Sequence, residues 1–169
     1  QAPTAIQRLD YRAPDWLVPD IALDFDLDPK QTTVIARLHV RRNGTHDRPL
    51  VLDGDGLAPL VVHVDGEPIS DWRIENHQLI VPLPGDNHLI TTEVAIQPDQ
   101  NTQLMGLYAS GGLLCTQCEA EGFRRITFFP DRPDVLSRYK VKMAAARETY
   151  PILLANGDPI ASGDAGQGR

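Results

Sequence analysis

The 169-residue sequence has no surplus of positive charge. Its 16 Lys and Arg residues are outnumbered by 23 Asp and Glu residues, which gives a formal net charge of −7 at pH 7. A surface of that sign repels phosphate groups, so the composition argues against binding to nucleic acid or to an anionic membrane surface. Apolar runs are also short, and none approaches the roughly 20 residues that a membrane-spanning helix needs.

Cysteine is scarce, and the first residues lack the pattern of a secretory leader. Two cysteines do not make a disulfide framework, and residues 1–16 lack the positively charged stretch and apolar stretch of a signal peptide. We therefore expect a cytoplasmic protein with reduced thiols. The sequence begins without Met and ends in a Gly-rich stretch that resembles a loop, so we expect a fragment of a longer protein.

The composition and length are those of one soluble globular domain. Hydrophobic residues make up 41% of the chain and charged residues 23%, which is ordinary for such proteins. No linker, repeat or low-complexity tract divides the sequence. We therefore expect a single domain over residues 1–169.

Alternating apolar and polar residues predict strands along most of the chain. Apolar residues occupy every second position in residues 23–27 and again in residues 33–40. The DPKQ stretch between these two runs is a turn, so they form a predicted hairpin. Asp65-Gly66 is another hairpin turn pattern. Further strands are predicted at residues 60–64, 69–74, 79–83, 90–96 and 139–145.

Two segments near the C-terminus complete the predicted fold. Residues 142–148 contain good helix formers, but they continue the alternation that begins at Tyr139, so we expect a strand. Asn156-Gly157 is a hairpin turn pattern, which predicts that residues 151–155 pair with a later segment, much of which we expect beyond residue 169. Together these strands predict an all-β fold, an antiparallel β-sandwich or saddle.

Cys115 and Cys118 form a CxxC pattern, which can be a redox pair or half of a zinc site. A redox CxxC normally opens a helix after a strand, and a zinc ribbon needs a second pair of cysteines. Neither context is present in this sequence. We favour two small, half-buried residues that flank a strand end. The histidines lack the spacing of metal ligands, so we expect surface or edge positions for His39, His46, His63, His77 and His88.

Gln117 and Glu119 are the candidate ligand-binding residues. In a strand, residues two apart point to the same side, so an amide and a carboxylate would project together. A carboxylate supported by neutral acceptors is suited to hold an ammonium group, such as the free N-terminus of a peptide. The spacing alone is weak support, because a solvated turn can carry the same pair.

The stretch from Cys115 to Val135, CTQCEAEGFRRITFFPDRPDV, carries a more specific combination. It contains Gln-x-Glu, then paired arginines, then a D-x-P turn. In this order it resembles the aminopeptidase N family of zinc-dependent exopeptidases, in its bacterial subgroup. The stretches DYRAPDWLVPDIALDFDLDP and YPILLANGD are also similar to that subgroup. The resemblance thus covers essentially the whole chain.

The resemblance implies the N-terminal domain of such an enzyme, an all-β saddle with a loop that reaches the neighbouring catalytic domain. Glu119 would hold the substrate's α-amino group, and Gln117 would line the pocket for the first side chain. The implied partners are peptides with a free N-terminus and the catalytic domain. Zinc would be bound outside this chain, because its sequence has no HExxH and no GxMEN motif. We expect no catalytic residue and no metal ligand in this chain.

Other residues of the stretch have structural interpretations. We expect Glu121 to be exposed. Arg124 and Arg125 are expected to anchor the loop through carbonyls or carboxylates, because arginine offers five rigid donors. Asp131 and Pro133 are predicted turn formers.

The aromatic residues near this stretch are expected to pack. Phe128 and Phe129 would point to opposite sides of an extended segment, one into the core and the other over the boundary with the next domain. Tyr108 and Met105 are expected to pack in the core or against a loop.

A second hypothesis is a stand-alone β-sandwich module that binds cations or peptides through the acidic loop without catalysis. Sandwich folds host many functions, so the fold cannot decide between the two hypotheses. Residues 115–135 favour the aminopeptidase hypothesis.

Overall fold

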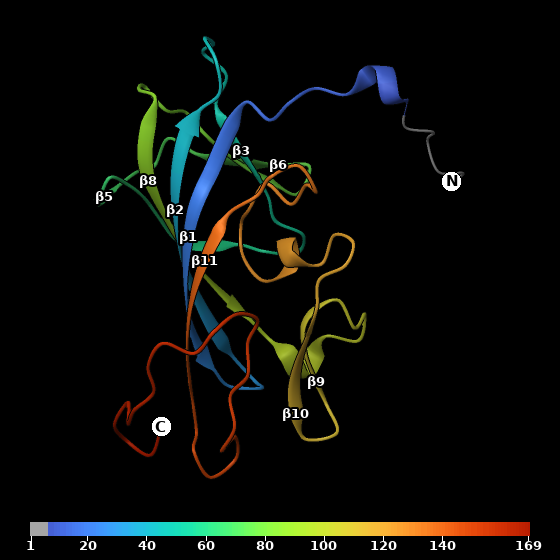
Figure 1. Cartoon of the computed structure of the whole chain (residues 1–169), viewed down its shortest axis with the longest axis vertical. Coiled ribbons are helices and arrows are strands. Elements are labelled where there is room, and N and C mark those ends of the chain that lie inside the picture. Colours follow the sequence, from blue (N-terminus) through green and yellow to red (C-terminus); the bar gives the residue numbers. More distant parts are fainter. Residues whose placement is uncertain (1–6) are drawn as a thin grey trace.

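The computed structural model describes residues 7–169, which fold mainly as strands (Figure 1). The helical pieces within that range are three short turns of 3-10 helix, η1 (Arg8–Asp10), η2 (Pro98–Gln100) and η3 (Phe123–Arg125). The strands are β1 (Trp16–Leu27), β2 (Thr32–Arg42), β3 (Leu50–Asp53), β4 (Pro59–Val64), β5 (Glu67–Pro68), β6 (Arg73–Glu75), β7 (Gln78–Val81), β8 (Asn87–Ile96), β9 (Gly106–Ser110), β10 (Leu113–Gln117) and β11 (Arg138–Ala145). Within residues 7–169, no helix has the length and apolar character to span a membrane.

Six strands form one large sheet, in the order β11-β1-β2-β8-β4-β5. Its neighbouring strands are antiparallel except for β1 and β11, which run parallel. A parallel pair needs a long crossover connection, and here all the chain between β1 and β11 serves as one. The predicted antiparallel arrangement therefore holds for every pair of this sheet except β1 and β11.

The β1–β2 hairpin confirms the prediction made from the alternating runs around DPKQ. Phe25 lies opposite Val34, and Asp26 lies opposite Thr33. Asp28 closes the turn, because its Oδ1 accepts a hydrogen bond of 2.8 Å from the N–H of Lys30. This is the local bonding for which aspartate is favoured in turns.

The large sheet has one buried face and one open, charged face. Ile21 and Leu23 of β1 are buried, whereas the alternate residue Asp24 faces the other way and pairs with Arg37 of β2 at 2.5 Å. The same alternation continues in β2 and β8. Period-two patterning thus directs one apolar set of side chains into the core.

Two smaller sheets pack against the buried face. One is three-stranded, in the order β3-β7-β6, and the other is the β9–β10 hairpin. Leu52, Leu79 and Leu107 from these sheets join the apolar residues of the large sheet in one core cluster. Figure 1 shows both small sheets on the same side of the large one. This arrangement confirms the predicted all-β fold.

The predicted strands at 60–64, 79–83, 90–96 and 139–145 correspond to β4, β7, β8 and β11. The prediction for 69–74 is wrong. After the Asp65-Gly66 turn, only the two residues of β5 pair back with β4. Residues 73–75 instead form β6, which pairs with β7. Asn76 and His77, both with positive φ, make a second tight turn there, which competes successfully for this segment.

The C-terminal predictions are half confirmed. Residues 138–145 form a strand, as expected from the alternation, but residues 146–149 turn instead of extending it. Residues 151–155 belong to no strand within residues 7–169, so their predicted pairing is not seen in this part of the protein and stays a prediction. The side chains from Pro151 to Gly168 are all exposed in this chain.

Candidate ligand-binding loop

The candidate site begins at a hairpin that the sequence analysis did not predict. β9 and β10 are joined by Gly111-Gly112, with φ of 57° and 81°. A two-residue Gly-Gly connection with positive φ is typical of tight hairpins, so this dipeptide is the pattern that could have revealed it. The hairpin ends at Gln117, and the loop that follows carries Glu119.

Gln117 and Glu119 lie close together, in a geometry that differs from two positions on one strand. β10 ends at Gln117, and its side-chain Nε2 donates to the backbone carbonyl of Glu119 at 3.2 Å. Both residues are exposed. Within residues 7–169, the structure records no hydrogen bond or ion pair to the Glu119 carboxylate. That carboxylate is therefore available to accept hydrogen bonds. The side chain of Gln117 stabilises the turn through its bond to the Glu119 carbonyl.

Close backbone packing fixes this loop. The N–H of Gly122 donates to the carbonyl of Cys118 at 2.8 Å. A Cβ at position 122 would lie 2.4 Å from the Gln117 carbonyl oxygen and 2.8 Å from the Cα of Cys118. Only glycine permits this approach, so Gly122 sets the path of the backbone around Glu119.

Arg124 ties the loop to the segment after it. Its Nε donates to Asp131 Oδ2 at 3.1 Å, and its Nη2 donates to the Asp131 carbonyl at 2.9 Å. The backbone N–H of Arg124 also donates to Asp131 Oδ2, at 3.1 Å. This fork of donors confirms that Arg124 anchors the loop through a carboxylate and a carbonyl.

Asp131 is in turn held by β3. Its N–H donates to Asp53 Oδ2 at 3.0 Å, while Asp53 Oδ1 accepts from Gln78 Nε2 at 2.8 Å. Asp53 also exchanges two backbone hydrogen bonds with Phe129, of 2.9 and 3.1 Å. The loop is therefore connected, through two aspartates, to the middle of the molecule.

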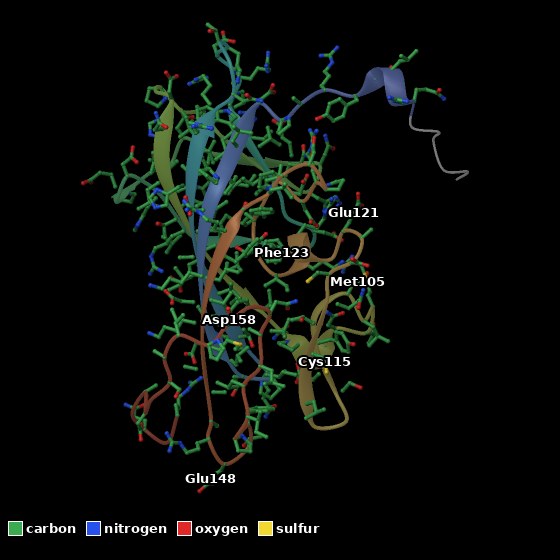
Figure 2. All side chains as sticks on the ribbon, viewed as in Figure 1. Met105, Cys115, Glu121, Phe123, Glu148 and Asp158 are labelled. Carbon is green, nitrogen blue, oxygen red and sulfur yellow. The ribbon has the colours of Figure 1, made fainter. Side chains whose placement is uncertain are left out.

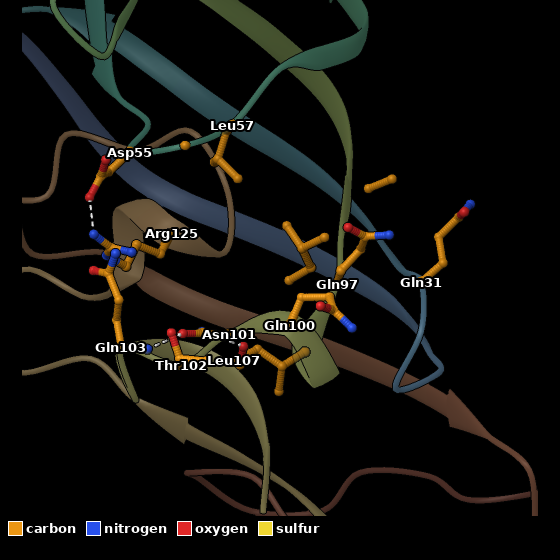
Figure 3. A pocket seen from close by; sticks show the side chains of 13 residues that line it. Gln31, Asp55, Leu57, Gln97, Gln100, Asn101, Thr102, Gln103, Leu107 and Arg125 are labelled. Carbon is orange, nitrogen blue, oxygen red and sulfur yellow. Dashed lines mark hydrogen bonds and ion pairs between the residues drawn. The ribbon is translucent and has the colours of Figure 1, made fainter.

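Arg125 makes a separate anchor to the loop after β3. Its guanidinium pairs with the carboxylate of Asp55, as predicted for an anchoring arginine. Figure 3 shows this pair at one end of a cavity of about 430 Å³, which Gln97, Gln100 and Gln103 also line. The cavity is open and polar, and neither Gln117 nor Glu119 lines it.

The prediction that only one of Phe128 and Phe129 is in the core is wrong, because both are buried. Phe128 packs so tightly on Gly54 that a Cβ there would lie 2.1 Å from its ring. Phe129 contacts Phe123 and Tyr139, with ring centroids 5.1 and 6.2 Å away. The Asp53–Phe129 backbone bridge turns this segment inward, so neither ring is left to cover a domain boundary.

The other predictions for this stretch are largely confirmed. Glu121 is exposed, with a contact of 3.4 Å to Arg124. Pro133 lies in a turn, whereas Asp131 serves mainly as the acceptor for Arg124. Met105 and Tyr108 are half-buried. Figure 2 places Met105, Cys115, Glu121 and Phe123 on the same side of the large sheet.

The two cysteines and five histidines are the side chains whose role as metal ligands the sequence analysis considered. Cys115 lies in the middle of β10 and Cys118 directly follows its last residue; both are free and half-buried. Burial raises the pKa of the Cys118 thiol, and the nearby carboxylate of Asp131 adds to that rise. Across residues 7–169 there is no group of three or more His, Cys, Asp and Glu side chains that could hold a metal ion.

The structure is an all-β domain with a Gln-x-Glu loop that two adjacent arginines anchor. Comparison with known protein families identifies the class to which such a domain belongs. The Peptidase M1 N-terminal domain family matches residues 16–169. The chain therefore belongs to this family, and the match confirms the resemblance drawn from residues 115–135.

Individual relatives agree with the family. Aminopeptidase N of Caulobacter vibrioides is 47% identical, over 99% of this chain and 20% of the relative. Aminopeptidase N of Escherichia coli is 46% identical, over 100% of this chain and 19% of the relative. The crystal structure of Legionella pneumophila aminopeptidase A in complex with aspartic acid superposes with a TM-score of 0.88, at 31% identity over 95% of this chain and 19% of that one. The chain thus spans about one fifth of the length of these relatives.

Proposed function

We propose that this chain is the N-terminal domain of a zinc-dependent, cytoplasmic aminopeptidase that removes N-terminal residues from peptides. In this proposal Glu119 binds the α-amino group of the substrate, and Gln117 lines the pocket for its first side chain. The observation that supports the assignment is the carboxylate of Glu119, which has no recorded partner in the described part of the chain and lies on a loop with a fixed backbone. A preorganised acceptor of this kind holds an ammonium group without first losing another partner.

In this proposal the catalytic zinc ion lies outside this chain. The sequence has no HExxH motif, and within residues 7–169 no three potential ligands come together. Three protein ligands are the usual requirement of a catalytic zinc. The proposed division of labour places the metal and its bound water in the remainder of the enzyme, while this chain positions the substrate amine.

The test is the kinetics of a Glu119→Ala variant of the complete enzyme. A lost charged contact of this kind is worth about 2–5 kcal/mol, so kcat/KM for peptides with a free N-terminus should fall by at least about thirtyfold. The free energy of unfolding should stay unchanged, because the carboxylate has no recorded partner among residues 7–169.

The matched control is Glu121→Ala, which removes an exposed carboxylate from the same loop. Its kcat/KM should stay within about twofold of the parent value, since exposed ion pairs are worth little. Unchanged kinetics in the Glu119 variant, or equal losses in both variants, would refute the assigned role.

The stand-alone binding module remains the second candidate, because sandwich folds serve many functions. Sequencing the reading frame beyond Arg169 separates the two. In-frame GxMEN and HExxH motifs support the aminopeptidase. A stop codon shortly after Arg169 supports the binding module and removes the enzymatic role of Glu119.

A further inference from the structure

The chain contains two Asn-Gly pairs, Asn43-Gly44 and Asn156-Gly157, which the fold holds differently. In such a pair the backbone nitrogen after the asparagine can attack the asparagine side chain, because glycine has no Cβ to shield that nitrogen. The two glycines are alike, with φ of 87° and 88°. A Cβ added to either of them would meet no atom within 4 Å. The difference between the pairs lies in the contacts of each asparagine.

Asn43 is held through both its backbone and its side chain. Its N–H donates to the Asp15 carbonyl at 2.8 Å, and its side-chain Nδ2 donates to the Pro14 carbonyl at 2.7 Å. Asn43 directly follows β2, so these bonds tie the end of that strand to the segment before β1. The carboxamide of Asn43 must therefore release a partner before it can turn towards the nitrogen of Gly44.

Asn156 lies in a long exposed loop. The N–H of Arg147 donates to the Gly168 carbonyl at 2.9 Å, which joins the two ends of this loop. Between those ends, residues 151–163 make no hydrogen bond that is recorded within residues 7–169. Asn156 and Gly157 are both exposed, and Figure 1 shows the segment as loops without strands. A backbone with so few contacts changes conformation readily, so the Asn156 carboxamide can reach the next nitrogen.

We propose that Asn156 is a site of spontaneous deamidation in this chain and that the fold protects Asn43 from the same reaction. The backbone nitrogen of Gly157 attacks Cγ of Asn156, and the new N–C bond closes a succinimide ring. The Cγ–Nδ2 bond breaks, and Nδ2 leaves as ammonia with the proton from the backbone nitrogen. Water then adds to one of the two ring carbonyls and opens the ring, which leaves aspartate or isoaspartate at position 156.

The reaction changes the charge and the backbone at this position. Either product adds one negative charge, which takes the net charge of the chain from −7 to −8. Isoaspartate also routes the backbone through the side-chain carbon and lengthens it by one atom. A tight Asn-Gly turn depends on its backbone dihedral angles, so this product would oppose the predicted hairpin at residues 156–157.

The test is a time course of deamidation in the folded 169-residue chain at mildly alkaline pH, where the attacking nitrogen loses its proton more readily. Trypsin cuts after Arg147, so peptide 148–169 contains Asn156 and no other asparagine, and Asn43 lies in a separate peptide. Mass spectrometry follows the replacement of NH2 by OH in each peptide, with unincubated protein as the zero point. Asn156 should react at least about tenfold faster than Asn43, because Asn43 must first lose hydrogen bonds. Equal rates at the two sites would overturn the proposal.

Denaturant separates the effect of the fold from that of the sequence. In concentrated urea both pairs lose their contacts, so the rate at Asn43 should rise towards that at Asn156. A rate difference as large in urea as in the folded chain would mean that flanking residues set it, and the protection of Asn43 by the fold would be refuted.

The variant pair is Gly157→Ala and Gly166→Ala. Both glycines have positive φ, of 88° and 85°, and a Cβ at either meets no atom within 4 Å, so the two changes strain the backbone alike. Gly157→Ala covers the attacking nitrogen and should slow the reaction at Asn156 by about tenfold, because the reacting atoms approach less closely. Gly166→Ala should leave the rate unchanged. An unchanged rate in Gly157→Ala, or equal slowing in both variants, would refute attack by the backbone of residue 157.

Discussion

At the scale of single residues, the conformation of the loop around Glu119 depends on contacts made by the neighbouring residues Gln117 and Gly122. The sequence identifies Gln117 and Glu119 through a pattern, but it gives no sign that Gln117 binds the Glu119 backbone carbonyl. It also gives no sign that Gly122 must be glycine, because that requirement comes from atoms of residues 117 and 118. Residue identity is visible in the sequence, whereas the constraint on each residue arises from contacts that only the folded backbone creates.

Gly122→Ala tests this constraint. The added Cβ would meet the Gln117 carbonyl at 2.4 Å, and backbone atoms cannot rotate aside as a flexible side chain would. We expect a loss of about 1–3 kcal/mol in the free energy of unfolding, measured by urea denaturation, as for other overpacked positions. In the complete enzyme, KM should rise as well, because the path of the loop changes.

Gly163→Ala is the control for that change. A Cβ at Gly163 meets no atom within 4 Å, so this variant should match the parent in stability and kinetics. If Gly122→Ala were as stable as the parent, the close packing of this loop would not be a real constraint.

At the scale of elements, alternation predicted strands well wherever a strand has one buried face. β1, β2, β4, β7, β8 and β11 all contain a predicted run. The first part of β1 was missed, because a β-bulge between Leu17 and Asp20 changes the buried set from Trp16 and Val18 to Ile21 and Leu23. Such a bulge interrupts the period of two on which the prediction rests.

Strand partners were harder to predict than strands. The parallel pairing of β11 with β1 joins residues more than a hundred positions apart, and no local pattern encodes it. The β6–β7 hairpin depends on positive φ at Asn76 and His77, which the sequence alone does not distinguish from a loop. The anchoring role of Arg124 and Arg125 could be predicted from the sequence. Their carboxylate partners, Asp131 and Asp55, could not, because no local pattern encodes these pairings.

Arg124→Lys tests the anchor between the loop and the segment 129–131. Lysine keeps the charge but cannot donate to both the carboxylate and the carbonyl of Asp131, as Nε and Nη2 of arginine do. We expect a loss of about 1–3 kcal/mol in the free energy of unfolding, since these hydrogen bonds involve a charged group. Denaturant titration followed by circular dichroism measures it.

The matched control is Arg41→Lys, at an exposed position on β2 for which the structure records no side-chain partner within residues 7–169. Its free energy of unfolding should lie within about 0.5 kcal/mol of the parent. Equal stability of the Arg124 and Arg41 variants would mean that the fork on Asp131 does not hold the loop.

At the scale of the whole molecule, Tyr139 connects the large sheet to the loop. It lies on β11, beside β1, and its ring centroid is 5.8 Å from that of Phe123 and 6.2 Å from that of Phe129. The sheet, the short helix η3 and the bridge to β3 therefore meet at one aromatic cluster. Global unfolding must separate these rings, so the titration of Tyr139 is linked to the stability of the entire fold.

This linkage predicts a loss of stability at high pH. Tyr139 keeps 51% of its surface exposed, and its partial burial raises its pKa from an ordinary value of 10.0 to about 12, with Asp131 and Cys118 adding to the rise. The unfolded chain therefore gives up this proton first. The contribution of Tyr139 is fully present below pH 10 and is lost as the pH rises towards 12. Urea denaturation at intervals between pH 9 and 12 should show the free energy of unfolding falling more steeply in the parent chain than in Tyr139→Phe, which has no hydroxyl to ionise. Equal slopes in the two chains would mean that the Tyr139 hydroxyl is as well solvated in the folded protein as in the unfolded one.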